Sequence, residues 1–243
     1  MWSEARIRAG HRLAMHARIK DGFLLRNRTP MVTFTFDDLP KSAVTTGAQL
    51  LQASGARGTF YVSGGEVGVD TPDWQSGSTA DIVSLYRRGH EIGCHTYSHT
   101  RACDLGTTAF GEEIAFRELD SAIEVETFAY PFGMGSFTRK YLLKEKFQTC
   151  RSIVPGANAG FVDLQFLRST PLIDREIDCR GIDRVFDEAE GTNGWLIFYG
   201  HDVADRPSCY GCTPGSLRHS LEAATRRKIP VLTMAEALRC ARA

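Results

Sequence analysis

The sequence predicts an α/β fold built on a parallel sheet. Short runs rich in β-branched and aromatic residues alternate along the chain with longer segments in which apolar residues recur at helical spacing. No linker, low-complexity tract or break in composition divides the 243 residues. Alternation of this kind builds βαβ units, and six candidate strands are compatible with either an open sheet or a closed barrel.

The expected strands are short, and helix-compatible segments lie between most of them. The strands are expected at residues 31–36, 59–62, 91–94, 127–130, 151–154 and 195–199, the fifth being the weakest. The helices are expected at residues 43–54, 79–88, 108–121, 137–146 and 215–227, with Ser, Thr or Asp near their starts. Residues 1–28 are expected to form an N-terminal arm or helix, and residues 29–243 a single domain.

Composition excludes several classes of protein. The 29 Lys and Arg residues balance 29 Asp and Glu, so the chain has no overall attraction for nucleic acid. Seven cysteines without framework spacing favour a reducing compartment, and Cys209 and Cys212, a lone Cys-x-x-Cys, are expected to shape a loop. No apolar core follows the basic N-terminus, and no stretch is apolar enough to cross a bilayer, so we expect a cytoplasmic protein.

Two carboxylates follow the first strand directly. Asp37 and Asp38 stand between that apolar run and Pro40, at the edge where parallel sheets place their ligands. Adjacent side chains on a strand point to opposite sides, so one carboxylate can face a site while the other turns the loop. Taken alone, the pair is explained as simply by a strand end or a helix cap.

Two histidines follow the third strand. His95 and His99 are four residues apart, close enough for both to reach one ion. Two imidazoles and a carboxylate suit catalytic zinc or a similar divalent metal, and the Asp pair supplies the carboxylate. His90 lies at the other end of that strand and is expected in a turn or at the surface.

Two further strand ends carry candidate groups. The fourth strand runs into Pro131-Phe132-Gly133, where a turn can hold a backbone N–H toward a ligand or can be simply a turn. The last strand ends at His201, a candidate general acid or base whose alternative is a hydrogen-bonded loop residue.

Together these motifs resemble the NodB-homology polysaccharide deacetylases, carbohydrate esterase family 4. The matching segments run from Thr35-Phe36-Asp37-Asp38 to His201. The resemblance implies a distorted (β/α) barrel, commonly of fewer than eight strands. It also implies a hydrolase that removes N-acetyl or O-acetyl groups from an amino-sugar oligo- or polysaccharide, with a divalent metal, zinc first and cobalt, nickel or manganese as alternatives.

The resemblance gives a role to each matched residue. It implies Asp37 as general base, His201 as general acid and the Phe132 N–H as an oxyanion donor. The implied metal ligands are Asp38, His95 and His99. The expected substrate pocket consists of Leu196, Trp195, Tyr130 and Pro131, although ordinary core is the simpler interpretation of Trp195.

The sequence departs from the family pattern beside the general base. Where the family carries an arginine two residues before the motif proline, this chain has Ala129, and we predict that Arg168, at the end of a later apolar run, supplies the guanidinium. The alternative for Arg168 is an exposed strand end. Leu39 replaces the usual glycine, and the carboxylate that orients His201 has two candidates, Asp174 and Asp178.

Two other functions fit the same motifs. One is deformylation or deacylation of a lipid-linked amino sugar, which makes the expected partner either an acetylated glycan or a glycolipid precursor. The other, motivated by Ala129, is a metal-containing glycan-binding protein with impaired turnover. The sequence predicts no oligomeric state.

Overall fold

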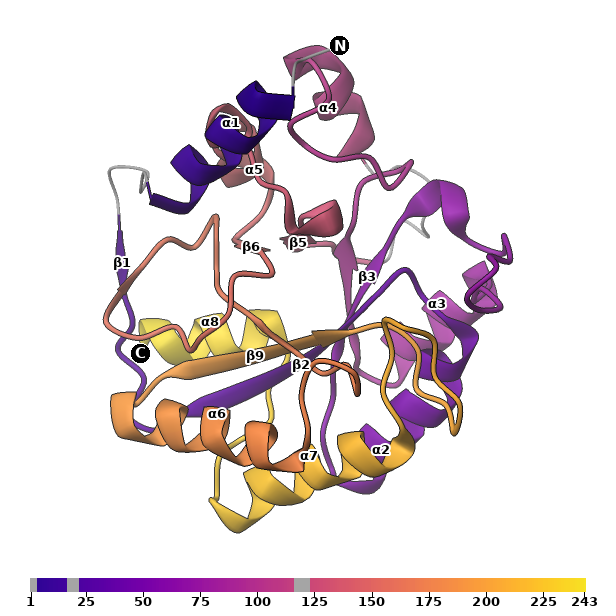
Figure 1. Cartoon of the computed structure of the whole chain (residues 1–243), viewed down its shortest axis with the longest axis vertical. Coiled ribbons are helices and arrows are strands. Elements are labelled where there is room, and N and C mark those ends of the chain that lie inside the picture. Colours follow the sequence, from indigo (N-terminus) through magenta and orange to yellow (C-terminus); the bar gives the residue numbers. More distant parts are fainter. Residues whose placement is uncertain (1–3, 17–21, 116–122) are drawn as a thin grey trace.

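A parallel sheet of seven strands forms the centre of the computed structural model, which describes residues 4–16, 22–115 and 123–243 (Figure 1). The strand order is β6-β5-β4-β3-β2-β9-β8. The strands are β2 (Met31–Asp37), β3 (Thr59–Val62), β4 (Glu91–Cys94), β5 (Thr127–Ala129), β6 (Thr149–Arg151), β8 (Thr170–Pro171) and β9 (Trp195–Gly200). A separate antiparallel pair joins β1 (Phe23–Leu24) to β7 (Phe161–Val162).

Helices connect the strands as the alternation predicts. They are α1 (Glu4–His16), α2 (Ala48–Ala53) after a π-helical turn (Ala43–Gly47), α3 (Thr79–Arg87), α4 (Thr107–Glu113), α5 (Phe137–Lys146), α6 (Cys179–Thr192), α7 (Pro214–Arg226) and α8 (Met234–Arg242). The end of the helix expected at 108–121 lies outside the described residues. Sequence analysis missed α6 and α8, although Asp178 caps α6 by accepting the Gly181 N–H, which is an ordinary start signal.

Alternate residues of the central strands face two different layers. Val32, Phe34 and Phe36 of β2 pack outward with residues of α2, α6 and α7. Met31 packs on the opposite side with Trp195 and with α8, and Figure 1 shows α6 and α7 on one side of β2 and β9 and α8 on the other. Because side chains alternate along a strand, Asp37 shares the inner face with Met31.

The sheet curls, and an irregular segment joins its two edges. The Cys150 N–H of β6 donates to the Leu164 carbonyl (2.7 Å), and the Leu167 N–H donates to the Cys150 carbonyl (2.8 Å). A few residues later the same segment becomes β8 and pairs with β9. This arrangement confirms the predicted distorted (β/α) barrel.

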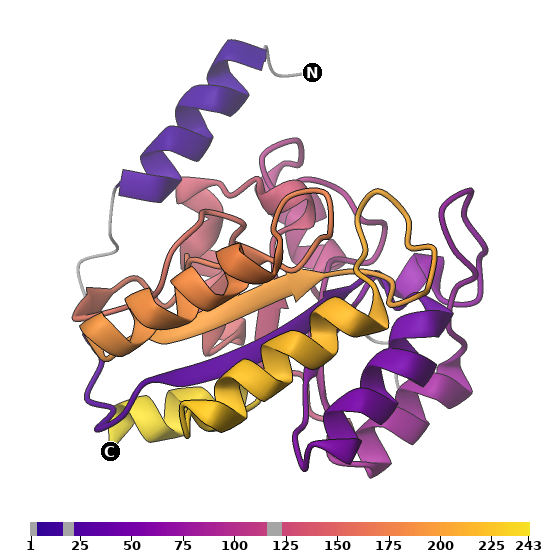
Figure 2. The ribbon, with the colours of Figure 1, turned by 60° about the horizontal axis from the view of Figure 1, so that its bottom comes forward.

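The amino end of the sheet is covered. The N–H groups at the start of α8 donate to the hydroxyl of Thr59 (Met234 N–H, 3.1 Å) and the carboxylate of Glu91 (Ala235 N–H, 3.0 Å), where β3 and β4 begin. Figure 2 shows α1 at one margin of the molecule, where it contacts α5. The open end of the barrel is therefore the carboxyl end. Among the described helices, none has the length and apolar character needed to traverse a bilayer.

Candidate active site

A cavity of about 370 Å³ opens at the carboxyl end of the sheet. Its lining comes from the ends of β2, β4, β5 and β9 and from the segments that follow β3, β6 and β8. It includes Asp37, Asp38, Glu66, Trp74, His95, His99, Tyr130, Phe132, Ile153, Ile173, Tyr199, His201 and Tyr210. The four strand-end motifs of the sequence therefore meet in one cavity.

The ligand atoms of Asp38, His95 and His99 lie within 4.8 Å of one another, as the spacing of the motifs predicts. Asp38 Oδ1 is 3.6 Å from His95 Nε2 and 3.4 Å from His99 Nε2. The same oxygen is buried and has no hydrogen-bond partner, which is costly unless a cation completes its environment. A carboxylate and two imidazoles around one point fit a divalent metal ion.

Both histidines are in the form that binds metal. The Nδ1 of His95 lies 2.8 Å from the Ala129 carbonyl oxygen, an arrangement that places the proton on Nδ1 and turns the Nε2 lone pair toward Asp38. Burial lowers the pKa of His95 to about 3 and also lowers the pKa of His99, so the rings stay neutral at pH 7. Burial raises the pKa of Asp38 to about 7, and a cation in the cluster would favour its ionised form.

The backbone around this cluster is strained. Asp38, Leu39, Thr96, His99 and Phe132 all have left-handed φ values, between 50° and 63°. Each such residue costs about 1–2 kcal/mol, which the surrounding packing must offset. Strain of this kind concentrates at sites whose geometry is fixed for a ligand.

Leu39, where the family carries glycine, gives a stability prediction. Its φ of 53° favours glycine, but its side chain is 1% exposed. It packs in the outer core, the cluster that the outward residues of β2 form with α2, α6 and α7. Replacing a buried leucine with a small residue costs about 2–5 kcal/mol, whereas relieving left-handed strain returns about 1–2 kcal/mol. We therefore expect Leu39→Gly to lower the free energy of unfolding, measured by urea denaturation; an unchanged or higher value would show that strain outweighs packing.

A buried arginine from β6 neutralises Asp37. Arg151 Nη2 donates to both carboxylate oxygens of Asp37, at 2.6 Å to Oδ2, and Arg151 is fully buried. Its guanidinium lies 5.2 Å from the ring centre of Tyr61 and 5.4 Å from that of Tyr199. Burial alone would raise the pKa of Asp37, but opposing contributions, the largest of them from the Arg151 guanidinium, lower it.

The prediction that Arg168 contacts Asp37 is wrong. The Arg168 side chain is exposed, and its Nη1 donates to the Pro155 carbonyl (2.9 Å). Sequence analysis started the weak strand at Arg151, whereas β6 ends there. That shift moves Arg151 from the amino end of the barrel to its carboxyl end. Arg151 also pairs in register with Ala129, so its guanidinium enters beside the position where the family carries its arginine.

Two predicted pocket residues lie elsewhere. Leu196 packs in the outer core with Val32, and Trp195 is buried in the inner core, its Nε1 donating to Thr33 (2.9 Å). Both stand at the start of β9, at the far end from the cavity. Tyr199, which sequence analysis missed, lines the cavity in their place, since it lies near the carboxyl end of β9.

The motif at the end of β5 is divided between the cavity and the core. Tyr130 lines the cavity and donates its hydroxyl to the Gln165 carbonyl (3.0 Å), whereas the neighbouring Pro131 is buried outside the lining. Phe132 is 58% exposed, and its ring centre lies 4.6 Å from that of His99. The turn therefore places Phe132 beside His99, one of the three clustered residues.

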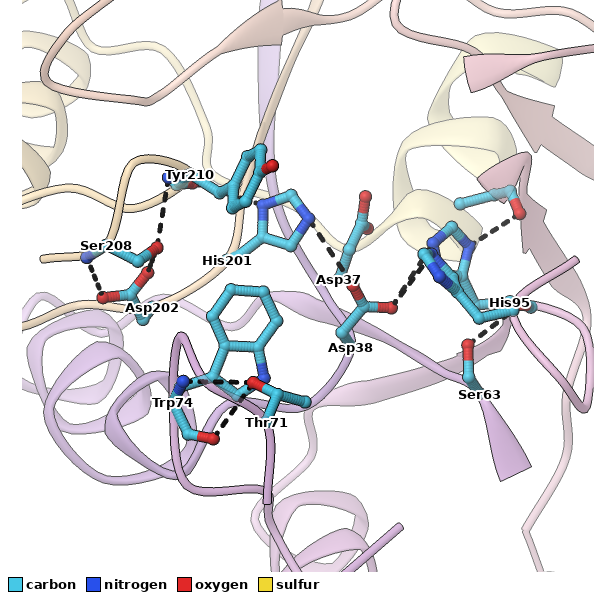
Figure 3. Close-up of polar contacts among 12 residues, drawn as sticks. Asp37, Asp38, Ser63, Thr71, Trp74, His95, His201, Asp202, Ser208 and Tyr210 are labelled. Carbon is cyan, nitrogen blue, oxygen red and sulfur yellow. Dashed lines mark hydrogen bonds and ion pairs between the residues drawn. The ribbon is translucent and has the colours of Figure 1, made fainter. Parts of the chain in front are cut away.

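His201 lies on the other side of Asp38, as Figure 3 shows. Its Nε2 is 3.6 Å from Asp38 Oδ2, and its Nδ1 is 3.2 Å from the Tyr210 carbonyl oxygen. Neither predicted orienting carboxylate fills that role, because Asp174 accepts the Thr213 N–H and Asp178 caps α6. The loop that carries Tyr210 includes Cys209 and Cys212, both free thiols. Cys212 is buried, and its backbone forms an isolated parallel β-bridge with Val203.

The geometry agrees with comparisons to known proteins. The family model for polysaccharide deacetylase matches residues 25–147, just over half of the chain, and the chain belongs to that family. A chitin deacetylase from Arthroderma benhamiae is 31% identical over 93 residues, which is 38% of this chain and 23% of that protein. The match thus spans under a quarter of that relative's length.

Solved structures share the fold. A family 4 carbohydrate esterase from Streptomyces lividans in complex with acetate superposes with a TM-score of 0.58 at 16% identity, covering 86% of this chain and 94% of the esterase. The peptidoglycan deacetylase PdaC from Bacillus subtilis gives a TM-score of 0.56 at 16% identity, covering 88% and 92%. These likenesses support the barrel and its topology.

Proposed function

We propose that this chain is a metal-dependent hydrolase that removes N-acetyl groups from an amino-sugar oligo- or polysaccharide. The observation that carries the proposal is the meeting, in one cavity, of an arginine-paired Asp37, the Asp38–His95–His99 cluster and His201 on its far side. Family membership agrees with it. Zinc is the metal that the ligand set favours.

Each residue has a distinct task in this reaction. A divalent ion held by Asp38, His95 and His99 would act as a Lewis acid toward the acetyl carbonyl and toward a water molecule. Asp37, kept ionised by Arg151, accepts the proton of the attacking water. The Phe132 N–H donates to the developing oxyanion, and His201 Nε2 donates a proton to the departing nitrogen. The products are acetate and a free amino sugar.

Acetate release and metal content test the proposal together. Purified protein is expected to contain about one divalent ion per chain and to release acetate from N-acetylglucosamine oligomers. His99→Ala should abolish both. Formate release from N-formylated sugars would redirect the proposal to a deformylase, and a metal-loaded protein inert on a broad panel of acylated glycans would overturn it. Arg151 favours an active hydrolase over a glycan-binding protein with impaired turnover, because it supplies the guanidinium absent at Ala129.

A carboxylate of α4 yields a prediction for metal affinity. Glu113 accepts the N–H groups of Tyr97 (2.9 Å) and Ser98 (2.8 Å) and the Ser98 hydroxyl (2.7 Å), in the loop between the two histidines. Losing such outer contacts typically costs about 10–100-fold in metal affinity. We expect Glu113→Gln to weaken zinc binding by about 10-fold in chelator competition. Glu112→Gln, one residue away and exposed, is the control; equal affinities for both variants would contradict the prediction.

A further inference from the structure

Two aromatic side chains from separate loops contact the ring of His201 (Figure 3). Trp74, between β3 and α3, stacks on it at a centroid distance of 5.4 Å and an interplanar angle of 30°. Tyr210, between β9 and α7, lies 5.6 Å from it at 51°, and the two aromatic rings meet each other edge to face at 6.4 Å. The imidazole plane is thus restricted from both loops.

The single hydrogen bond of His201 does not fix the orientation of its ring, so the aromatic contacts are needed for that. Its Nδ1 contact to the Tyr210 carbonyl, at 3.2 Å, is at the long end of the range for such bonds and involves an uncharged acceptor. In acid–base sites a carboxylate commonly fixes the histidine ring, and none of the described carboxylates lies at Nδ1 here. Stacking on Trp74 therefore supplies the orientation that one hydrogen bond leaves open.

Both loops are built to hold these rings. The Thr71 hydroxyl accepts the N–H groups of Asp73 (3.2 Å) and Trp74 (3.1 Å), which closes the turn around the tryptophan. The following Gly77 N–H donates to the Leu39 carbonyl (2.8 Å), which ties this loop to the segment that carries Asp38.

The second loop is braced by a buried carboxylate. Asp202 accepts the N–H (2.8 Å) and the hydroxyl (2.6 Å) of Ser208, and the Ser208 hydroxyl accepts the Tyr210 N–H (3.1 Å). These bonds set the position of the Tyr210 carbonyl and ring. Both loops that contact the His201 ring are therefore anchored by their own hydrogen bonds.

We infer that Trp74 is a positioning residue for His201, holding the imidazole so that Nε2 faces the departing nitrogen. The inference rests on the proposed function. A role for Trp74 as a sugar-stacking platform is less consistent with the geometry, because one face of its ring is covered by His201. As a positioning residue, Trp74 acts on proton donation and has little effect on substrate binding.

Trp74→Ala tests the inference through the leaving group. Amide cleavage needs a proton at nitrogen, whereas p-nitrophenolate leaves without one. We expect Trp74→Ala to lower kcat for acetate release from N-acetylglucosamine oligomers by about 10–100-fold with KM nearly unchanged, and to spare hydrolysis of p-nitrophenyl acetate. Trp74→Phe, which keeps a stacking face, should recover most of kcat. Tyr141→Ala, on the exposed face of α5, is the control for losing an aromatic side chain elsewhere.

Two outcomes would overturn the inference. They are an unchanged kcat, whether or not KM rises, and equal losses on the amide and the ester that Trp74→Phe does not rescue. Failure of the proposed function looks different, because the unaltered protein would then release no acetate from any glycan.

Discussion

Arg151→Met is expected to destabilise the fold and to reduce turnover by orders of magnitude. The substitution keeps most of the side-chain volume but leaves Asp37 as a buried charge with no guanidinium beside it. Breaking a buried ion pair by removing one partner typically costs about 3–5 kcal/mol. Turnover should fall as well, since Arg151 both orients the Asp37 carboxylate and keeps it ionised.

The stability loss should depend on pH with a defined sign. In the unaltered protein the pKa of Asp37 is lowered, so the ion pair stabilises the fold above the unfolded pKa and loses this effect as pH falls. Without Arg151, burial raises that pKa, and protonation relieves the buried charge. The difference in unfolding free energy between the two proteins should therefore shrink from pH 7.5 toward pH 5, as measured by urea denaturation.

Arg168→Met is the matched control for removing an arginine. Its side chain is exposed and contacts only loop backbone among the described residues, so we expect a change within about 0.5 kcal/mol and normal acetate release. A large loss of activity in Arg168→Met with little effect in Arg151→Met would contradict the assignment of the guanidinium to β6.

Moving the arginine from β6 to its paired position on β5 tests, by gain of function, whether a guanidinium beside Asp37 is what activity requires. Ala129 and Arg151 are paired between β5 and β6, so their side chains leave the sheet on the same side. We expect Ala129→Arg combined with Arg151→Ala to recover part of the activity that Arg151→Ala alone loses. Failure of the pair to exceed the single variant would indicate that the approach from β6 itself is required.

The polar residues at the ends of the strands were the part of the site that the sequence could predict. Asp37, Asp38, His95, His99 and His201 each follow an apolar run, and parallel strands bring such ends to one edge. The α/β alternation likewise predicted five strands of the large sheet in place and a sixth, β6, two residues late. These features depend on local pattern, which one sequence contains.

The errors occurred where a boundary or the direction of a side chain decides the outcome. A shift of two residues in the predicted bounds of β6 placed Arg151 at the wrong end of the strand, away from the cavity. Leu196 was assigned to the cavity, although side chains alternate along a strand and Leu196 faces outward from the start of β9. Trp74 reaches His201 from a loop with no motif of its own, so its role depends on long-range packing that local pattern does not contain.

The adjacent carboxylates Asp37 and Asp38 should separate catalysis from metal binding. Asp38 belongs to the ligand cluster, and its unpartnered Oδ1 is the oxygen nearest both histidines. We expect Asp38→Asn to lose bound metal and acetate release together, because a neutral amide is a much poorer ligand for a divalent ion than a carboxylate.

Asp37→Asn should keep the metal and lose turnover. Asp37 is bonded to Arg151 and lies outside the ligand cluster, so the site for the ion stays intact. An amide cannot accept the proton of the attacking water, and loss of a general base typically costs about 10²–10⁴-fold in rate. Metal per chain by elemental analysis and acetate release should be measured on both variants at a temperature where each is folded. Asp205→Asn, at an exposed position in the loop between β9 and α7, serves as the control for the substitution itself. Because the two carboxylates are neighbours on one chain, equal metal loss in both variants would mean that Asp37 also ligates the ion, and full activity in Asp37→Asn would move the base to another residue.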